Sequence, residues 1–110
     1  MVNILLTGSS RGIGAAIANV LSDENLVGHA TRSGIPADFD EPGAPAALWA
    51  EALDRLGGKI DVLINNAGIF EANPLDGERA DWLAGWERTM RINLTAAAEL
   101  CRLAVLHWQQ

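Results

Sequence analysis

Three glycines lie close together near the start of the chain, directly after the apolar segment 2–6. They are Gly8, Gly12 and Gly14, in a G-x-x-x-G-x-G spacing. Glycine has no Cβ, so its backbone can come close to a ligand. The first turn of a helix has unpaired N–H groups and the positive end of the helix dipole, and it therefore stabilises a bound anion. A helix that begins in this loop makes residues 7–14 a candidate phosphate-binding site.

The glycine spacing separates this loop from two other phosphate-binding loops. It is not the G-x-G-x-x-G pattern of the standard dinucleotide fold, and no Gly-Lys-Ser or Gly-Lys-Thr follows it as in a P-loop. A simpler interpretation stays open, in which the glycines only make the turn between a strand and a helix. Of the two interpretations we favour nucleotide binding.

Four residues at the end of a second apolar segment have a similar character. Asn65 ends the mainly apolar segment 60–65, and Asn66, Ala67 and Gly68 follow it. An Asn side chain both donates and accepts hydrogen bonds, so it can tie one loop to a neighbouring strand. Gly68 leaves room for a ligand. An ordinary Asn/Gly turn is the alternative.

The end of the expected second strand bears on which dinucleotide is bound. In the standard fold an acidic residue there holds the ribose 2′-hydroxyl. Here the residues are Thr31, Arg32 and Ser33, with no carboxylate among them. The planar guanidinium of Arg32 suits a 2′-phosphate, and Arg11 adds a second positive charge in the glycine loop. We therefore predict NADP rather than NAD, the alternative being that both arginines simply face solvent.

Strands that alternate with helices predict how these loops are positioned. We expect an α/β fold with a three-layer, Rossmann-like parallel sheet in the strand order 3-2-1-4. Ligands of such sheets bind at the carboxyl ends of the strands, between strands one and four, where both motifs fall. The expected strands are 2–6, 26–31, 35–39 and 60–65, and the expected helices begin near residue 12 or span 46–56 and 79–108.

The last helix carries a regular apolar stripe, which we expect to be buried. Its members have a 3-4-3-4 spacing: Leu94, Ala97, Cys101, Ala104 and Trp108. Within this stripe Cys101 is expected to be an inert buried thiol. Core packing is also the expected role of Trp82, Trp86 and Met90.

Length and composition limit the possible classes of protein. With 110 residues, 49% of them hydrophobic, the chain is at most one folded domain, 1–110. Its net charge of −6 argues against binding to nucleic acid or an anionic membrane. A single cysteine and the lack of a signal or membrane segment favour the cytoplasm. His29 is expected in a strand and His107 on the surface. The acidic residues 38, 40 and 41 are expected to be solvated, and no metal site is predicted.

The two motifs together resemble those of the short-chain dehydrogenase/reductase family. Residues 7–14 look like its TGxxxGIG cofactor motif, and residues 65–68 look like its NNAG motif. The resemblance places Asp38 near the adenine ring, and it makes Asn93 the Asn of the catalytic tetrad, which kinks the helix and helps to hold a proton-relay water. The residues it assigns to the cofactor are Thr7, Gly8, Ser10, Arg11, Gly12, Ile13, Gly14, Arg32, Asp38, Asn65, Asn66, Ala67 and Gly68.

The resemblance also shows what this chain lacks. Family members transfer a hydride between nicotinamide and a carbonyl or alcohol, with the help of a Ser and a Tyr-x-x-x-Lys pair. The chain has no tyrosine, and its single lysine, Lys59, precedes segment 60–65. We therefore expect the cofactor-binding half of an NADP(H)-dependent oxidoreductase, incomplete at its C-terminus and inactive alone. The alternatives are a non-catalytic dinucleotide-binding module or an oligomerisation module that pairs through helix 79–108.

Overall fold

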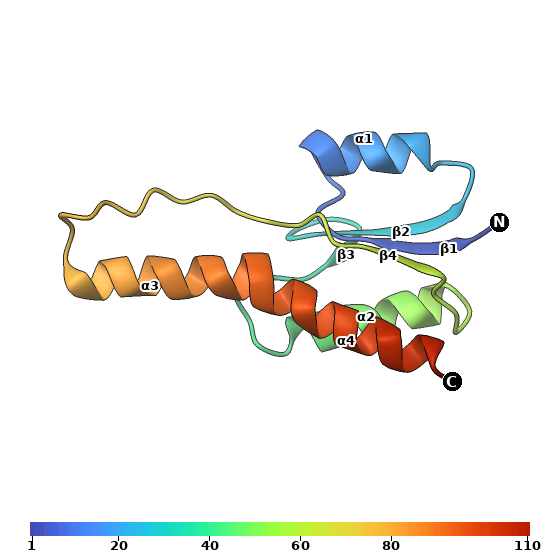
Figure 1. The fold of residues 1–110 in the computed structure, drawn as a ribbon. Coiled ribbons are helices and arrows are strands. Elements are labelled where there is room, and N and C mark those ends of the chain that lie inside the picture. The colour runs from blue at the N-terminus through green and yellow to red at the C-terminus, as the bar shows by residue number, and fades with distance from the viewer.

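A four-stranded parallel sheet with helices on both faces is the centre of the fold (Figure 1). The computed structural model describes all residues from 1 to 110. Helix α1 covers one face of the sheet, and α2 and α4 cover the other, so the expected three layers and the strand order β3-β2-β1-β4 are confirmed. The strands are β1 (Asn3–Leu6), β2 (Asn25–Ala30), β3 (Ile35–Pro36) and β4 (Val62–Ile64), and the helices are α1 (Gly12–Val20), α2 (Ala44–Arg55), α3 (Arg79–Met90), the π-helix η1 (Arg91–Thr95) and α4 (Ala96–Trp108).

Strand β1 lies between β2 and β4, and its side chains form the middle of the core. Its residues pair in parallel register, Leu6 opposite Gly28 on one side and Ile64 on the other. Leu5 and Leu6 are completely buried, as expected of a central parallel strand covered on both faces. The carboxyl ends of β1 and β4 therefore meet, and the two motif loops leave the sheet side by side.

Two of the strands are shorter than the sequence predicts by more than one residue. β3 ends at Pro36 instead of residue 39, and proline has no N–H with which to extend the hydrogen-bond ladder. β4 covers 62–64 instead of 60–65. The residues that flank it belong to other contacts: Ile60 is buried in the core, and Asn65 already turns away from the sheet toward α4. The short β3 leaves residues 37–39 without strand pairing beyond one bond, from Ala37 N–H to the Ala30 carbonyl.

The prediction of which residues of the last helix are buried is wrong, except for Ala104. The buried residues are Ile92, Ala96, Leu100 and Ala104, whereas Leu94 is 56% exposed and Trp108 50% exposed. Cys101 is also exposed, so it is not the buried thiol that we expected. The helix has apolar residues on two faces, and periodicity alone does not tell which face meets the sheet and α2. A π-helical turn at η1 also inserts an extra residue in mid-helix and shifts the face beyond it.

The tryptophans of α3 do not pack in the core. α3 contains no buried residue, and it projects beyond the end of the sheet (Figure 1). Trp86 is 52% exposed and Met90 37% exposed. Trp82 and Trp86 stack on one another instead, with ring centroids 5.7 Å apart. The expectation of core packing fails because no layer of the fold reaches this end of the helix.

The carboxyl end of α4 is anchored by two aromatic side chains. His107 Nε2 accepts a hydrogen bond from Ile60 N–H at 3.2 Å, and its ring meets Trp49 edge-on. Trp108 Nε1–H donates to the Ile60 carbonyl at 2.8 Å. His107 is therefore a half-buried structural residue and not a plain surface position.

No helix of the chain is both long enough and apolar enough to cross a membrane.

Replacement of Leu100 by alanine tests which face of α4 is buried. Leu100 is completely buried and Leu106, on the same helix, is 46% exposed. We expect Leu100→Ala to lower the free energy of unfolding by about 2–5 kcal/mol, because it leaves a cavity. Leu106→Ala, the matched control, should cost less than about 1 kcal/mol. Urea denaturation followed by circular dichroism measures both losses, and equal losses would contradict the burial described above.

Candidate functional site

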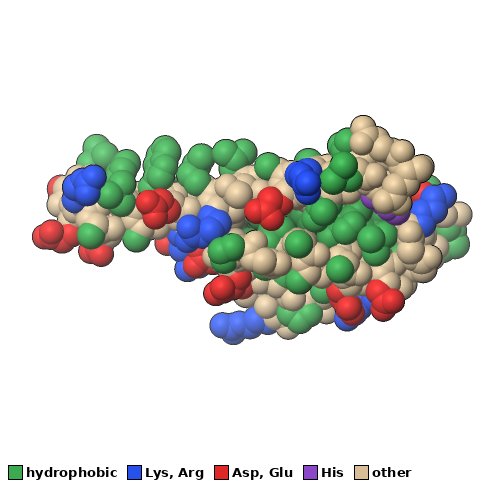
Figure 2. Space-filling view, turned by 90° about the horizontal axis from the view of Figure 1, so that it is seen from below, with side chains coloured by type: hydrophobic (Ala, Val, Ile, Leu, Met, Phe, Trp, Pro, Cys, Tyr) green, Lys and Arg blue, Asp and Glu red, His purple; other side chains and the backbone are tan.

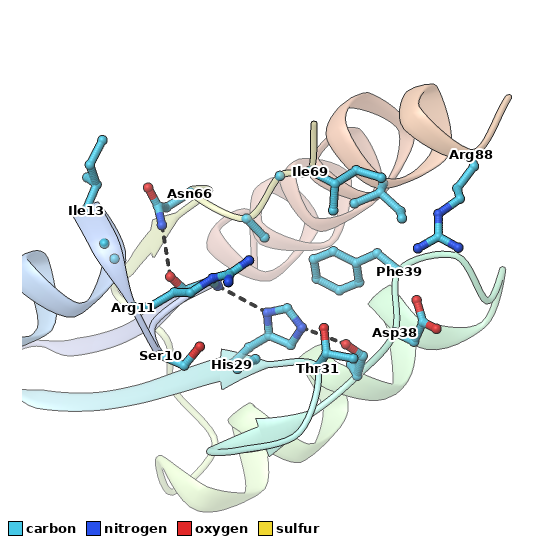
Figure 3. A pocket seen from close by; sticks show the side chains of 18 residues that line it. Ser10, Arg11, Ile13, His29, Thr31, Asp38, Phe39, Asn66, Ile69 and Arg88 are labelled. Atoms are coloured by element: carbon cyan, nitrogen blue, oxygen red, sulfur yellow. Dashed lines mark hydrogen bonds between the residues drawn. The ribbon is translucent and has the colours of Figure 1, made fainter. Parts of the chain in front are cut away.

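A cavity of about 490 Å³ opens at the carboxyl ends of the strands. Figure 3 shows the side chains that line it. Its walls come from the glycine loop, the end of β2, the segment after β3 and the loop after β4. Helix α3 and the π-turn add one residue each. The lining residues are 8, 10–14, 29–31, 37–39, 66–69, 88 and 92. The two sequence motifs therefore do meet in one place.

The glycine loop folds tightly onto itself, and Gly14 and Gly12 show why it needs glycine. A Cβ at Gly14 would lie 1.7 Å from the Gly8 carbonyl oxygen, a distance that no side chain tolerates. Gly12 has a φ of +58°, in the left-handed region that favours glycine. A Cβ at Gly12 would meet no atom within 4 Å, so this residue borders open space. The loop is thus closed on its inner side and open toward the cavity.

The first turn of α1 offers unpaired donors to the cavity. The helix begins at Gly12, and the N–H groups of Gly12, Ile13 and Gly14 make no hydrogen bond within the chain. Arg11 precedes the helix without capping it, and the first turn has no acidic residue. Three free amides at the positive end of a helix dipole form a cradle for an anion. The residues present therefore fit the pyrophosphate of a dinucleotide.

Thr7 lies beneath the cavity and joins the two loops. Its side-chain Oγ1 accepts hydrogen bonds from Asn66 N–H and from Ala67 N–H, both at 3.0 Å. The hydroxyl donates to the Ile64 carbonyl at 3.5 Å. A further bond, from Asn66 Nδ2–H to the Gly8 carbonyl at 3.0 Å, ties the same loops together. Thr7 is 1% exposed and does not line the cavity, so its position suits holding the loops rather than touching a ligand.

Two other predicted residues lie outside the cavity. The Asn65 side chain turns to α4, where its Nδ2 lies 3.4 Å from the Ala97 carbonyl and 3.3 Å from Cys101 Sγ. Arg32 is exposed after β2 and does not line the cavity, whereas Arg11 does. Of the other predicted cofactor residues, the structure brings together 8, 10, 12–14, 38 and 66–68.

Asn93 lies in the π-turn and holds the loop that follows β4. Its Oδ1 accepts a hydrogen bond from Ile69 N–H, and its Nδ2–H donates to the Ile69 carbonyl, both at 2.8 Å. Its side chain also faces Gly68, where a Cβ would come within 3.4 Å of Oδ1. Asn93 thus fixes the edge of the cavity where the loop after β4 meets the long helix, which consists of α3, η1 and α4.

The sequence motifs do not reveal the contribution of His29. This residue is 4% exposed and lines the cavity (Figure 3). Its ring bonds to Gly8 N–H and to the Ala37 carbonyl and stacks on Phe39 with centroids 4.4 Å apart. Burial lowers the pKa of His29 below its ordinary value of 6.5, although the bond to Ala37 opposes this shift. The lowered pKa keeps the ring neutral near pH 7.

An ion-pair cluster lies beside the cavity on the side of α3, where Arg88 lines it. Arg91 Nη2 lies 2.6 Å from Asp40 Oδ1, and Arg88 Nε lies 2.6 Å from Glu71 Oε1. Arg88 also approaches Asp40, at 3.8 Å. The expectation that the acidic cluster is merely solvated is therefore wrong for Asp40. No local pattern could have shown this, because the partners are 48 and 51 positions away in the chain.

The strand order, the glycine loop and the amide cradle define a Rossmann-like fold. The family model described as "short chain dehydrogenase" matches residues 24–110. The chain therefore belongs to the short-chain dehydrogenase family. The match covers the loop after β4 and the long helix, while the glycine loop lies before it.

Individual relatives agree with this assignment. "Short chain dehydrogenase ausX" of Emericella nidulans is 34% identical over 90% of this chain and 56% of its own length. A blue fluorescent protein from a metagenomic library, solved with NADPH, superposes with a TM-score of 0.77 at 31% identity over 90% of this chain and 48% of its own. A 3-alpha-hydroxysteroid dehydrogenase from Pseudomonas sp. B-0831, solved with NADH, gives 0.70 at 29% identity over 88% and 38%. The chain spans about half the length of such relatives.

Exchange of Thr7 tests how the two loops are held. Thr7→Val keeps the shape of the side chain but leaves the partly buried Asn66 and Ala67 amides without an acceptor, at a cost of about 1–3 kcal/mol each. We expect Thr7→Ser, which keeps the hydroxyl, to be clearly more stable than Thr7→Val. Thermal unfolding of the two variants and the wild type measures the difference. If valine were as well tolerated as serine, the hydroxyl would not be what joins the loops.

Proposed function

We propose that this chain binds a nicotinamide dinucleotide and is the cofactor half of an NADP(H)-dependent oxidoreductase that acts on a carbonyl or an alcohol. The single observation that carries the proposal is the amide cradle at the start of α1, where residues 12–14 have free N–H groups beside an open cavity. Membership of the short-chain dehydrogenase family supports it. A non-catalytic dinucleotide-binding module is the alternative.

The lining residues suggest how the dinucleotide would lie. The pyrophosphate would accept hydrogen bonds from the amides of Gly12–Gly14, and the adenosine half would extend toward Asp38. The nicotinamide half would extend toward Asn66–Ile69, the loop that Asn93 holds. When bound, the nicotinamide would supply or accept a hydride. The part of this chain is to place the ring and to hold the loop beside it.

Arg11 is the residue on which we base the preference for NADP. It lines the cavity, whereas Arg32 does not, and no carboxylate at the end of β2 would repel a 2′-phosphate. A guanidinium beside a phosphate forms strong, charge-assisted hydrogen bonds. Solved relatives carry NADPH in one case and NADH in another, so the family as a whole does not decide the preference.

Proton transfer is the function that these 110 residues lack. A hydride transfer to a carbonyl needs a proton donor of suitable pKa next to the substrate oxygen. The chain has no tyrosine, and Lys59 is paired with Asp61 at the amino end of β4, opposite the cavity. We therefore propose that the single domain 1–110 supplies the cofactor site and does not turn over substrate alone.

Calorimetric titration with NADPH and NADH tests the proposed cofactor and its preference. We expect NADPH to bind more tightly, and Arg11→Gln to weaken NADPH by about tenfold, or about 1.4 kcal/mol, with little effect on NADH. Arg102→Gln, an exposed arginine on α4 outside the cavity, is the matched control. Absence of heat with both nucleotides would reject the function, and equal affinities would reject only the preference.

A panel of ketones with NADPH tests the proposal that the chain does not turn over substrate alone. Steady oxidation of NADPH by the pure protein would contradict that proposal.

A second function, assembly with another copy of the chain, rests on the exposed face of the long helix. Trp86, Leu94 and Trp108 are each at least half exposed, and Val105 is 48% exposed. Hydrophobic side chains stand in a row along the projecting arm in Figure 2. Exposed apolar surface of this extent is typical of an interaction site. A homo-oligomer that pairs through residues 79–108 would cover it.

A charge placed on this face should separate such an assembly. We expect light scattering to show a dimer or larger species for the wild type, and Leu94→Glu to shift it to monomer because burying the carboxylate is costly. Val20→Glu adds the same charge at a residue of α1 that is 80% exposed, and it should leave the mass unchanged. A wild type that stays monomeric at every concentration would reject this assembly.

A further inference from the structure

His29 stands between the two ends of the cavity and bonds to both. Its Nδ1 lies 3.2 Å from the backbone nitrogen of Gly8, the first residue of the glycine loop at the cavity wall. Its Nε2 lies 2.8 Å from the carbonyl oxygen of Ala37, directly before Asp38 and Phe39. Figure 3 shows the His29 ring with a dashed hydrogen bond on each side, and the ring stacks on the neighbouring Phe39. One side chain thus connects the phosphate end of the cavity with the adenosine end.

The two partners define the protonation state of the ring. A backbone N–H only donates, so Nδ1 must be the unprotonated nitrogen that accepts from Gly8. A carbonyl only accepts, so Nε2 must carry the hydrogen that is donated to Ala37. This is the neutral ring with its proton on Nε2. The N–H of Gly8 makes no other hydrogen bond in the chain.

We propose that His29 is a positioning residue, which fixes the glycine loop relative to residues 37–39 and thereby makes binding of the dinucleotide depend on a neutral ring. This inference rests on the proposed function. The segment 37–39 follows a strand of only two residues, so it depends on few bonds for its position. A bond from Ala37 N–H to Ala30 and the ion pair of Asp40 with Arg91 hold its flanks. The ring of His29 holds its cavity side.

A second proton on His29 would break this connection. It would enter at Nδ1, where it faces the Gly8 N–H, and two donors cannot bond to one another. The charged side chains that share the cavity are Arg11, Asp38 and Arg88. Arg88 is paired with Glu71, and the Asp38 carboxylate accepts a bond from Asp40 N–H. Burial therefore stays the main influence on the pKa, which it lowers.

The direction of the pH effect follows from this lowered pKa. Above the ordinary pKa of 6.5 the ring is neutral whether or not the chain is folded, so the connection is fully present. As the pH falls through the lowered pKa of the folded chain, the ring takes up a proton and the connection is lost. Dinucleotide affinity should therefore be constant above about pH 6.5 and should decrease as the pH falls through the lowered pKa of His29.

Nitrogen-15 NMR of the cofactor-free protein tests the connection directly. We expect the His29 ring near neutral pH to show a protonated Nε2 and an unprotonated Nδ1. The Gly8 amide should exchange with solvent slowly in the wild type and faster in His29→Leu, with circular dichroism used to verify that the variant is folded. His29→Asn, which places an acceptor close to the position of Nδ1, should keep part of the protection. A cationic ring, a proton on Nδ1, or unchanged Gly8 exchange in both variants would overturn the proposal.

The pH profile of NADPH affinity tests the functional consequence. We expect the wild-type dissociation constant to rise by about tenfold between pH 7.5 and pH 5, and His29→Leu to bind about tenfold more weakly at pH 7.5 with a flatter profile. His107→Gln is the matched control, because His107 also accepts a backbone hydrogen bond but lies outside the cavity. A wild-type profile like that of His29→Leu would overturn the proposal. If no nucleotide binds at all, the proposed function fails, and the NMR result still decides the positioning role.

Discussion

The close contact between the glycine loop and the loop after β4 is the constraint on which the site depends. The hydrogen at Gly14 occupies space next to the Gly8 carbonyl that no carbon could enter, and Asn66 Nδ2–H bonds to that same carbonyl. Thr7 adds two more bonds from its buried hydroxyl. These contacts use the hydrogen-bonding groups on the inner side of the loop. The amides of residues 12–14 lie on its outer side and remain unpaired. A preformed set of donors of this kind binds an anion without having to rearrange first.

Local rules were enough to predict the sheet and the place of the cavity. The strand order follows from the alternation of strands and helices and from the handedness of their connections. Both motif loops follow strands of one parallel sheet, so their meeting at the carboxyl edge could be predicted without any knowledge of side-chain contacts. Several of the predictions that failed concern the long helix. Its residues 94, 97, 101, 104 and 108 are as regularly spaced as a buried stripe, yet the core lies against residues 92, 96, 100 and 104.

The contacts that sequence reasoning missed join residues without a shared local pattern. Asp40 and Arg91 are 51 positions apart, and their ion pair exists only because the segment after β3 meets the beginning of the π-turn. In the sequence His29 is an ordinary polar strand residue. Only the structure shows that its two ring nitrogens bond to Gly8 and Ala37. Thr7 belongs to the recognised motif, but its three-dimensional role is to join loops beneath the cavity. Sequence spacing can reveal a motif. Which of its residues line the cavity and which hold the loops together depends on where their side chains point.

The π-turn at Arg91–Thr95 makes one stretch of the long helix tolerant of a change in chain length. Such a turn contains one residue more than a regular helix needs at that place, and it accommodates this residue as a local bulge. Loss of one residue there would turn the bulge into regular helix, so Leu100 and Ala104 would stay in the core and His107 would keep its bond to Ile60. Loss of one residue within α4 would instead rotate the rest of the helix by about 100° relative to the core. Natural variation in the length of this helix should therefore be found at the π-turn and not farther along.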